Sequence, residues 1–414
     1  MGVPPTLWLA GAFALFMAWN IGANDVANAM GTSVGSGALT IRQAIVVAAI
    51  LEFSGAFFVG GHVTDTVRKG ILAPEAVALH MADLPLGMLG SLAAAATLLF
   101  GATRFGLPVS TTHSIVGAIV GFGAVTMGVD AIEWGKIAQI AVSWVTSPLI
   151  GGVLAFLIFS LTRWLILDRE DPSARVKRYG PFFYFVVTGV IGLVTLFKGL
   201  KNLKLDFDLP EALLLSALLG LVGAGVGAIF LRRARPRDGP PDDRFYDVER
   251  SFVVLQILTA CAVAFAHGSN DVANAIGPLA AIIHSFSEVE YAQKAAVPPW
   301  MLLVGGGGIV LGLATWGYRV METVGRKITE LTPSRGFAAE LAAALTIVLA
   351  SRLGIPVSTT HILVGSVLGV GLARGIGALD LRVVGTILVS WVATLPIAAG
   401  LSILFFYLFR GLLA

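Results

Sequence analysis

Residues 22–29 read GANDVANA, and residues 268–275 repeat this stretch as GSNDVANA. A second motif, PVSTTH, occupies residues 108–113 and returns at residues 356–361. The Asn-Asp pairs lie 246 positions apart (270 − 24), and the PVSTTH runs 248 positions apart (356 − 108). A unit of half the chain therefore occurs twice. A duplicated polar motif inside apolar segments is typical of secondary transporters.

The composition is that of an integral membrane protein. Hydrophobic residues make up 56% of the 414 positions and charged residues only 13%, whereas soluble domains carry about 25% charged residues. The net charge of +3 comes from basic residues in predicted loops, so it reports on topology rather than on a nucleic-acid partner. The single cysteine, Cys261, can form no internal disulfide and indicates no metal cluster.

The apolar stretches predict an all-α fold with about 12 transmembrane helices, since a spanning helix needs about 20 residues. The predicted spans are 7–32, 41–61, 84–103, 109–129, 137–167, 182–197, 211–231, 251–283, 300–318, 337–352, 356–373 and 383–409. The run 356–373 is short and starts at a proline. It and 109–129 are therefore either spanning helices or arms of re-entrant hairpins.

Lysine and arginine predict the orientation. The loops 168–181 and 232–250 carry ten of these residues together, against three in 198–210. The excess puts the first two loops in the cytoplasm and both termini outside. Seven spans separate the starts of the two copies, and an odd number gives them opposite orientations, an inverted-topology repeat. A miscounted span would make the copies parallel.

This reading divides the chain into three parts. Residues 1–167 form the first repeat of five spans, residues 168–250 hold two linking spans, and residues 251–414 form the second repeat. No ATP-binding GxxxxGK[ST] motif occurs, so the energy source must be an ion gradient.

The paired GxNDVANA and PVSTTH motifs resemble those of the inorganic phosphate transporter (PiT) family of ion-coupled symporters. Similar runs include LEFSGA at 51–56, TVRKGI at 66–71 and PSRGFAAELAAA at 333–344. The resemblance implies phosphate uptake driven by Na⁺ or H⁺, a transport core built from both repeats, and a homodimer. Some relatives carry sulfate, so the resemblance alone leaves the substrate open.

The PVSTTH runs are suited to binding phosphate. A proline at the first turn followed by free backbone N–H groups is typical of a helix N-terminus, which attracts anions. Hydroxyl groups add further donors. The predicted phosphate-binding residues are Ser110, Thr111, Thr112, Ser358, Thr359 and Thr360. The alternative is that these hydroxyls only cap helices or bond back to carbonyls.

The Asn-Asp motifs are suited to binding a hard cation, which prefers carboxylate and amide oxygens. An intramembrane carboxylate is costly and marks a functional site by default. We predict Na⁺ at Asp25, Asp271, Asn28 and Asn274, because an i, i+3 spacing puts each Asp beside its Asn on a helix. Asn24 and Asn270 belong to the same predicted coupling site.

Two glutamates and two histidines complete the candidates. Glu52 and Glu340 lie in apolar segments without counterparts in the other copy, and the family resemblance implies cation or proton sites there. The alternative for Glu340 is a position at a helix end in the interface. For His113 and His361, which end the PVSTTH runs, the favoured role is a neutral hydrogen-bond donor rather than a titrating group.

We therefore expect a secondary active transporter of the cell inner (plasma) membrane that imports phosphate with Na⁺ by alternating access. It needs no cofactor besides the transported cation. H⁺-coupled transport of phosphate or metal–phosphate, and sulfate permeation, remain alternatives. An anion channel fits two-sided access less well, and an intramembrane hydrolase would need motifs such as G-x-S-x-G or H-E-x-x-H, which are absent.

Overall fold

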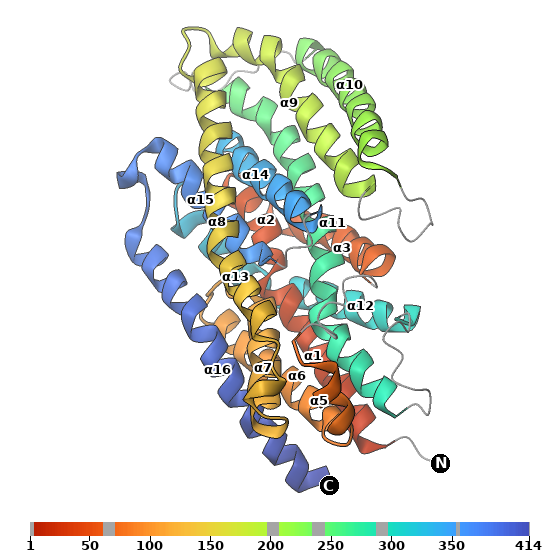
Figure 1. The fold of residues 1–414 in the computed structure, drawn as a ribbon. Coiled ribbons are helices and arrows are strands. Elements are labelled where there is room, and N and C mark those ends of the chain that lie inside the picture. The colour runs from red at the N-terminus through yellow and green to blue at the C-terminus, as the bar shows by residue number, and fades with distance from the viewer. Residues whose placement is uncertain are drawn as a thin grey trace.

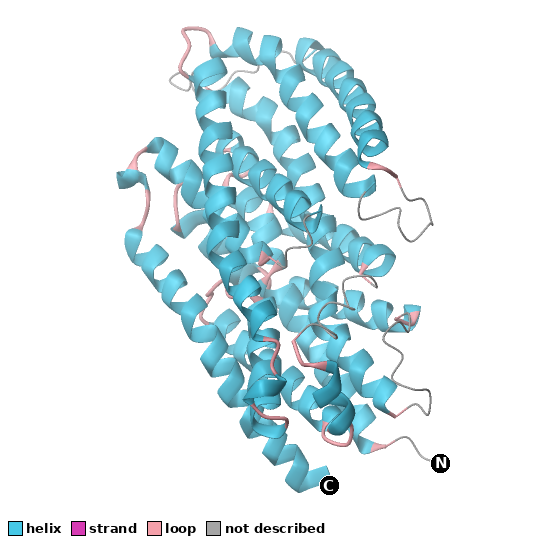
Figure 2. Cartoon of the chain, in the orientation of Figure 1, coloured by secondary structure: helices cyan, strands magenta, loops and turns pink. Residues whose placement is uncertain are grey.

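The computed structural model describes residues 4–60, 71–196, 207–233, 245–286, 297–352 and 357–413. Over these ranges the chain is helical, and its extended structure is limited to one isolated bridge between Leu72 and Ile132 (Figure 2). The predicted all-α fold is confirmed. The TVRKGI run falls outside the described residues except for its last residue, and most of the loops 198–210 and 232–250 is also not described.

The first half of the chain begins with two helices that carry the GANDVANA stretch and ends with a short helix followed by a long one. In order, the helices are α1 Pro5–Asn24, α2 Val26–Gly35, α3 Ile41–Val59, α5 Pro74–Leu79, α6 Leu84–Arg104, α7 Thr111–Thr126, the 3₁₀ turn η1 Val129–Ala131, α8 Trp134–Thr162 and the π-helical η2 Arg163–Leu167.

A helical hairpin then leads into the second half, which follows nearly the same order. The hairpin is α9 Pro172–Val194 and α10 Leu209–Arg233. It is followed by α11 Tyr246–Ser285, α12 Pro299–Trp316, α13 Tyr318–Glu322, the π-helical η5 Thr323–Lys327, α14 Pro333–Arg352, α15 Thr359–Arg374, the 3₁₀ turn η6 Ile376–Ala378 and α16 Leu381–Leu413.

The ends of the two halves match in local detail. Helices α7 and α15 both have 16 residues and both start directly after a Ser N-cap. Each is followed by a glycine with positive φ, Gly128 at 93° and Gly375 at 110°. Because L-residues with a side chain avoid this region, the glycines permit the turn into η1 and η6. The two halves thus share this local geometry after their PVSTTH runs.

The two halves pack against each other in reciprocal pairs. Helix α1 contacts α12 while α11 contacts α3, and α7 contacts α16 while α15 contacts α8. Likewise α6 contacts α16 and α14 contacts α8. Figure 1 shows α1 rising from the end where both termini lie and α11 descending from the opposite end. The hydrophobic core therefore extends across both halves of the chain.

Nine helical segments of the described chain are long and apolar enough to cross a membrane, and each overlaps a predicted span. Two further predicted spans, 109–129 and 356–373, form the shorter helices α7 and α15. The last, 182–197, falls largely within α9, which is not among the nine. A 16-residue helix is about 24 Å long, short of the roughly 30 Å hydrocarbon core.

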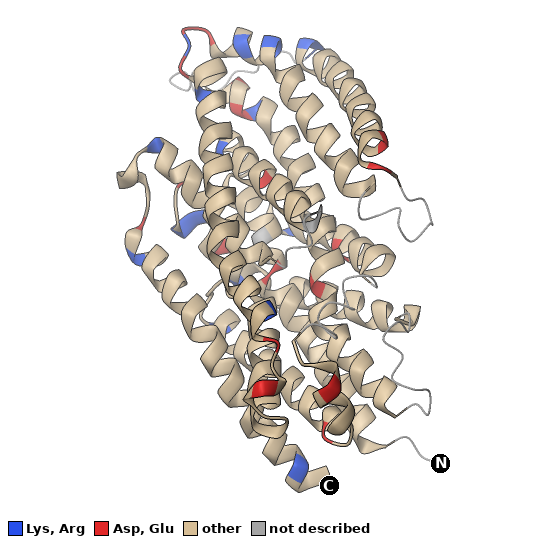
Figure 3. Cartoon of the chain, viewed as in Figure 1, with Lys and Arg blue, Asp and Glu red and all other residues tan. Residues whose placement is uncertain are grey.

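Charged residues gather at the ends of the molecule. In Figure 1 the connection between η2 and α9 lies at the end opposite both termini. Figure 3 shows Lys and Arg concentrated at that same end, where α9 begins and α10 finishes. The connection between η2 and α9 thus lies at the same end of the molecule as the end of α10.

Candidate functional site

Asp25 and Asp271 meet in the middle of the helix bundle. Asp25 occupies the break between α1 and α2, and Asp271 lies inside the unbroken α11. Their side chains are 0% and 1% exposed. One carboxylate oxygen of each and a ring nitrogen of His267 all lie within 4.8 Å of one another. Two acidic residues 246 positions apart therefore form one site.

His267 joins a third carboxylate to this site. Its Nδ1 lies 2.8 Å from Glu52 Oε2, and its Nε2 lies 2.8 Å from Asp271 Oδ2. Both Glu52 and His267 are buried. An imidazole protonated on both nitrogens can donate to both carboxylates and carries a positive charge. We call Asp25, Glu52, His267 and Asp271, with Thr359 and Thr360, the central cluster.

Glycine at the first position of the second GxND motif brings Glu52 within reach of His267. A Cβ on Gly268 would lie 2.2 Å from the Glu52 carbonyl oxygen, and one on Gly55 would lie 2.2 Å from the Phe265 carbonyl oxygen. Helices α11 and α3 are therefore in backbone contact at this level. Glycine is required here for close approach, a common reason for its presence in membrane helix interfaces.

The threonines of the second PVSTTH run hold both aspartates. Thr360 Oγ1 donates to Asp25 Oδ1 and Thr359 Oγ1 donates to Asp271 Oδ2, each at 3.2 Å. From the first run, Thr111 and Thr112 accept from the Asn274 amide at 3.1 and 3.3 Å. The predicted phosphate and cation residues therefore lie in one continuous polar region.

Ser110 and Ser358 cap the helices that they precede. Each hydroxyl oxygen accepts from the backbone N–H three residues later, at 3.2 Å from His113 and 3.3 Å from His361. The capping bond uses a lone pair, so each hydroxyl hydrogen can still be donated. In the described chain, the N–H groups of Thr111 and Thr112 make no backbone bond, as expected for the first residues of a helix.

The asparagines divide into two roles. Asn24 is fully engaged with the connection between α6 and α7: its amide donates to Thr103 Oγ1 and the Leu107 carbonyl, and its oxygen accepts from the Val109 N–H. Asn270 donates to Asp271 Oδ1 at 2.8 Å. Asn274 uses its nitrogen and leaves its oxygen available. The side chain of Asn28 lies outside the described part of the structure.

Glu340 lies in a separate cluster of hydroxyl groups. Its Oε1 accepts from Thr32 at 2.5 Å and from Ser33 at 2.8 Å, and its Oε2 accepts from Thr259 at 2.7 Å. All four side chains are buried. Thr32 is seven residues along α2 from Asp25, about 10 Å by helical rise. The two clusters are therefore neighbours on one helix but do not merge.

No lysine or arginine of the described chain forms an ion pair with Asp25, Glu52, Asp271 or Glu340. The charge balance of the central cluster is therefore one histidine against three carboxyl groups. Burying carboxylates without cations is expensive, and such sites normally take up cations or protons.

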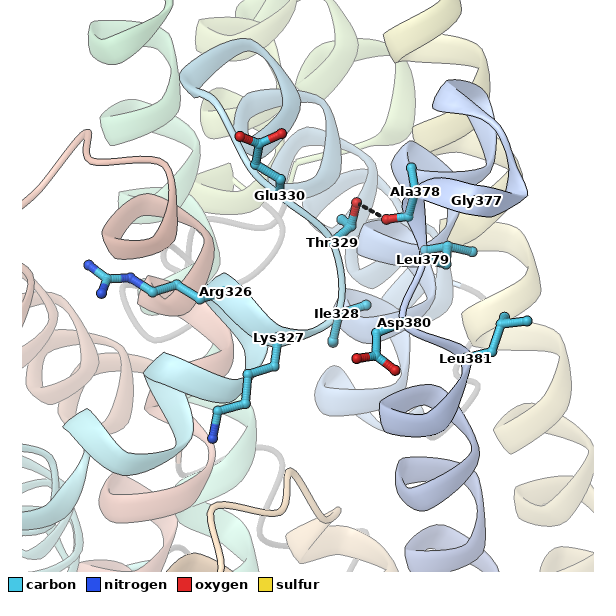
Figure 4. Close-up of a pocket in the computed structure, with 10 residues that line it drawn as sticks. All are labelled: Arg326, Lys327, Ile328, Thr329, Glu330, Gly377, Ala378, Leu379, Asp380 and Leu381. Atoms are coloured by element: carbon cyan, nitrogen blue, oxygen red, sulfur yellow. Dashed lines mark hydrogen bonds between the residues drawn. The ribbon is translucent and has the colours of Figure 1, made fainter.

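A surface pocket of about 600 Å³ lies apart from these clusters, between η5 and the start of α16 (Figure 4). Lys327 and Asp380 contribute opposite charges to its lining. Glu330 is already paired with Arg335 and Arg374, and Asp380 caps α16. None of the predicted site residues lines this pocket.

His267 is the functional candidate that the motif comparison misses. It precedes Asp271 by four residues, which places the two side chains on one helix face, and this spacing could have revealed it. Comparing the duplicated motifs hides it, because the first copy has Ile21 at that position. The hydroxyls of Thr32, Ser33 and Thr259 around Glu340 were likewise not predicted.

Comparison with known proteins shows the family to which the chain belongs. The model of the phosphate transporter family matches residues 21–402. A protein of Haemophilus influenzae named "Putative phosphate permease" is 46% identical over 409 residues, covering 98% of this chain and 96% of that protein. The chloroplastic inorganic phosphate transporter 2-1 of Arabidopsis thaliana is 44% identical over 428 residues, covering 97% of this chain and 72% of that protein.

A solved structure described as the sodium-dependent phosphate transporter has the same fold. It superposes with a TM-score of 0.88 at 41% identity, covering 98% of this chain and 99% of that one. These proteins are transporters and permeases rather than enzymes. With its duplicated motifs, its membrane helices and this match over nearly its whole length, the chain belongs to the phosphate transporter family.

Proposed function

We propose that this protein imports inorganic phosphate together with Na⁺ by alternating access. The observation that carries the proposal is the central cluster, in which buried carboxyl groups adjoin two hydroxyl-rich helix starts and no Lys or Arg of the described chain pairs with them. An anion cannot enter beside uncompensated carboxylates unless cations enter with it. Coupling then follows from electrostatics. The solved relative described as sodium-dependent supports Na⁺ as the cation.

Phosphate in this proposal binds between the starts of α7 and α15. The donors are the hydroxyls of Ser110, Thr111, Thr112, Ser358, Thr359 and Thr360, with the first N–H groups of α7. Helix N-termini favour anions through their unpaired N–H groups and the helix dipole. The hydrogen bonds from Thr359 and Thr360 to the aspartates then connect anion and cation sites.

Na⁺ in this proposal binds at Asp25 and Asp271, helped by Asn28, Asn270 and Asn274. Asp25 Oδ2 and Glu52 Oε1 are buried and have no hydrogen-bond partner in the described structure, so oxygen ligands are at hand. Glu52 acts through His267. Asn24 contributes by holding the α6–α7 connection. Glu340 is a second coupling site with hydroxyl ligands.

We further propose that residues 1–167 and 251–414 are inverted repeats joined by residues 168–250. The reciprocal packing and the opposite courses of α1 and α11 in Figure 1 support this. The pairs α6–α7 and α14–α15 act as re-entrant hairpins whose tips carry the PVSTTH runs. In this proposal the protein lies in the inner membrane as a homodimer, with both termini extracytoplasmic.

Uptake by purified protein in liposomes tests the coupling. Labelled phosphate is measured with an inward Na⁺ gradient, with a pH gradient alone, and with neither. We expect accumulation above the outside concentration only with the Na⁺ gradient. Equal accumulation under a pH gradient without Na⁺ would refute Na⁺ coupling, and mere equilibration in every condition would indicate a channel.

His267 supports one second candidate, H⁺-coupled transport of phosphate or of a metal–phosphate complex. Imidazole nitrogen is a poor ligand for Na⁺ but a good one for transition metals, and it can also carry a proton. The variants His267→Gln and Asp271→Asn distinguish the candidates. If His267→Gln keeps Na⁺-driven uptake, this second candidate loses its support. If the substitution removes a pH-driven or Zn²⁺-dependent component of uptake, the second candidate gains support.

A further inference from the structure

Four aromatic rings, three of them buried and Trp144 half-buried, form a column between the two halves of the protein. Trp144 of α8 lies 3.8 Å from His113 of α7, His113 lies 4.3 Å from His361 of α15, and His361 lies 3.6 Å from Trp391 of α16, measured between ring centroids. Trp144 and Trp391 occupy the same place in the repeated VSW runs, as the histidines do in PVSTTH. The column therefore consists of two equivalent His–Trp pairs.

The column is tied to the helix starts that carry the phosphate-binding hydroxyls. The N–H groups of His113 and His361 donate to the capping hydroxyls of Ser110 and Ser358. The Trp391 indole N–H donates to the Pro108 carbonyl at 3.1 Å, two residues before Ser110. A shift of the column would thus move the hydroxyls.

The hydrogen bonds of the column are one-sided although its residues are equivalent. His361 Nδ1 donates to the Trp144 carbonyl at 3.3 Å. Its counterpart His113 has both ring nitrogens buried and without a hydrogen-bond partner in the described structure. Trp391 bonds Pro108, whereas the Trp144 indole makes no hydrogen bond to any described residue. One of two equivalent sets is therefore formed.

We propose that this ring column positions the phosphate-binding hydroxyls, and that its hydrogen-bond set exchanges between the copies when the site changes sides. In the state described here His361 and Trp391 make the bonds. In the oppositely facing state His113 donates to the Trp391 carbonyl, and the Trp144 indole takes the part that Trp391 has here. The ring contacts persist in both states, because the two His–Trp pairs occupy equivalent places in the repeated motifs.

This inference rests on the proposed alternating access between inverted repeats. The competing explanation is that the rings only pack against one another. In that case all four rings stabilise both states in the same way. The exchange gives them opposite tasks: His361 and Trp391 stabilise the present state, whereas His113 and Trp144 stabilise the other. Substitution by phenylalanine separates the two explanations, because a phenylalanine keeps an aromatic ring in the column but cannot form the hydrogen bond that the original side chain makes in one of the two states.

The test uses the variants His361→Phe, Trp391→Phe, His113→Phe and Trp144→Phe. Each is made in a Cys261→Ser background with Thr112→Cys as a reporter in the half-buried site. A membrane-impermeant maleimide is applied to oriented proteoliposomes from either face, and the ratio of the two labelling rates is compared with the reporter parent. Total labelling in detergent normalises each variant.

We expect His361→Phe and Trp391→Phe to shift the ratio toward one face by about twofold to tenfold, the range that one hydrogen bond supplies. His113→Phe and Trp144→Phe should shift it toward the other face. A shift of all four in one direction, or no shift, would overturn the exchange. Each direction has two variants, so one that fails to fold leaves its partner to decide.

A parallel measurement keeps the two proposals apart. Na⁺-driven phosphate uptake is measured for the wild-type protein. If it accumulates phosphate while the four variants shift together, only the ring-column inference fails. If it does not accumulate phosphate, the transport proposal fails, and opposite shifts of the two pairs would still support the exchange.

Discussion

At the scale of single residues, the buried aspartates can be tested most directly. Asp25 accepts from Thr360 and Asp271 from Thr359, so an amide of the same size would keep most of the packing. What the amide removes is the negative charge that, in our proposal, a bound cation neutralises. The neighbouring His267 would then face a weaker acceptor.

Asp25→Asn and Asp271→Asn should each abolish concentrative phosphate uptake with normal expression. Removing one partner of a buried charge pair costs about 2–5 kcal/mol, equivalent to thirtyfold or more in uptake rate. Initial rates in proteoliposomes measure the effect. The matched control is Glu75→Gln, which changes an exposed carboxylate. Wild-type uptake with unchanged cation dependence in either variant would remove that aspartate from the coupling site.

The choice of anion is also decided at single residues. The proposed site combines hydroxyl donors with carboxylates that, when ionised, can only accept. Phosphate near neutral pH keeps a proton to donate, whereas sulfate has none and would bring a lone pair against an acceptor. A buried acceptor left unpaired costs about 1–3 kcal/mol, which corresponds to about fivefold to over a hundredfold in affinity.

Excess unlabelled arsenate should therefore inhibit labelled phosphate uptake at pH 7, whereas sulfate should not. Arsenate has a shape and protonation similar to those of phosphate. The comparison needs equal ionic strength, because screening alone alters anion binding. Inhibition by sulfate as strong as that by arsenate would refute the donor–acceptor argument and favour a sulfate permease.

At the scale of elements, close contact between α3 and α11 builds the central cluster. Gly268 and Gly55 let the two backbones touch, and Glu52 thereby reaches His267 across 215 positions of sequence. Gly268, the glycine of the second motif, thus sets how closely the two helices approach each other. Its replacement should act on the site through the spacing of two helices.

Gly268→Ala should lower both the thermal stability and the rate of phosphate uptake. Its Cβ would lie 2.2 Å from the Glu52 carbonyl oxygen, and overpacking of this kind costs about 1–3 kcal/mol. Thermal unfolding in detergent and initial uptake rates measure the two effects. Gly225→Ala is the control, because a Cβ there meets nothing within 4 Å. Equal behaviour of the two variants would mean that the helices separate at little cost.

At the scale of the whole molecule, the orientation of the chain in the membrane can be tested. The connection between η2 and α9 and the end of α10 lie at one end of the molecule, and both termini lie at the other. The proposed orientation rests on the Lys and Arg excess of loops 168–181 and 232–250. The short α7 and α15 enter the proposal as half-spans.

Single cysteines in a Cys261→Ser background should report this orientation. Glu170→Cys and Asp242→Cys should react with an impermeant reagent from the cytoplasmic face only, and Lys201→Cys from the opposite face only. The reasoning is that two spans separate the first pair and one span separates each from residue 201. Reaction of all three from one face would contradict the inverted repeat.

The sequence by itself determined the fold class, the duplicated motifs and most residues of the polar region. Hydropathy and helical spacing are local properties, so the predicted spans and the PVSTTH helix starts at Ser110 and Ser358 could be read directly. Identical motifs at near-constant separation also indicated that the two copies act together. The meeting of Asp25 and Asp271 agrees with this expectation.

Only the tertiary structure decided which side chains touch. The pairing of Glu52 with His267, the use of Asn24 on the α6–α7 connection and the hydroxyls around Glu340 join residues 79 to 308 positions apart. Such contacts depend on which helix faces meet and how closely the glycines let them approach. A linear pattern does not encode this, because one helical period is compatible with many packing partners.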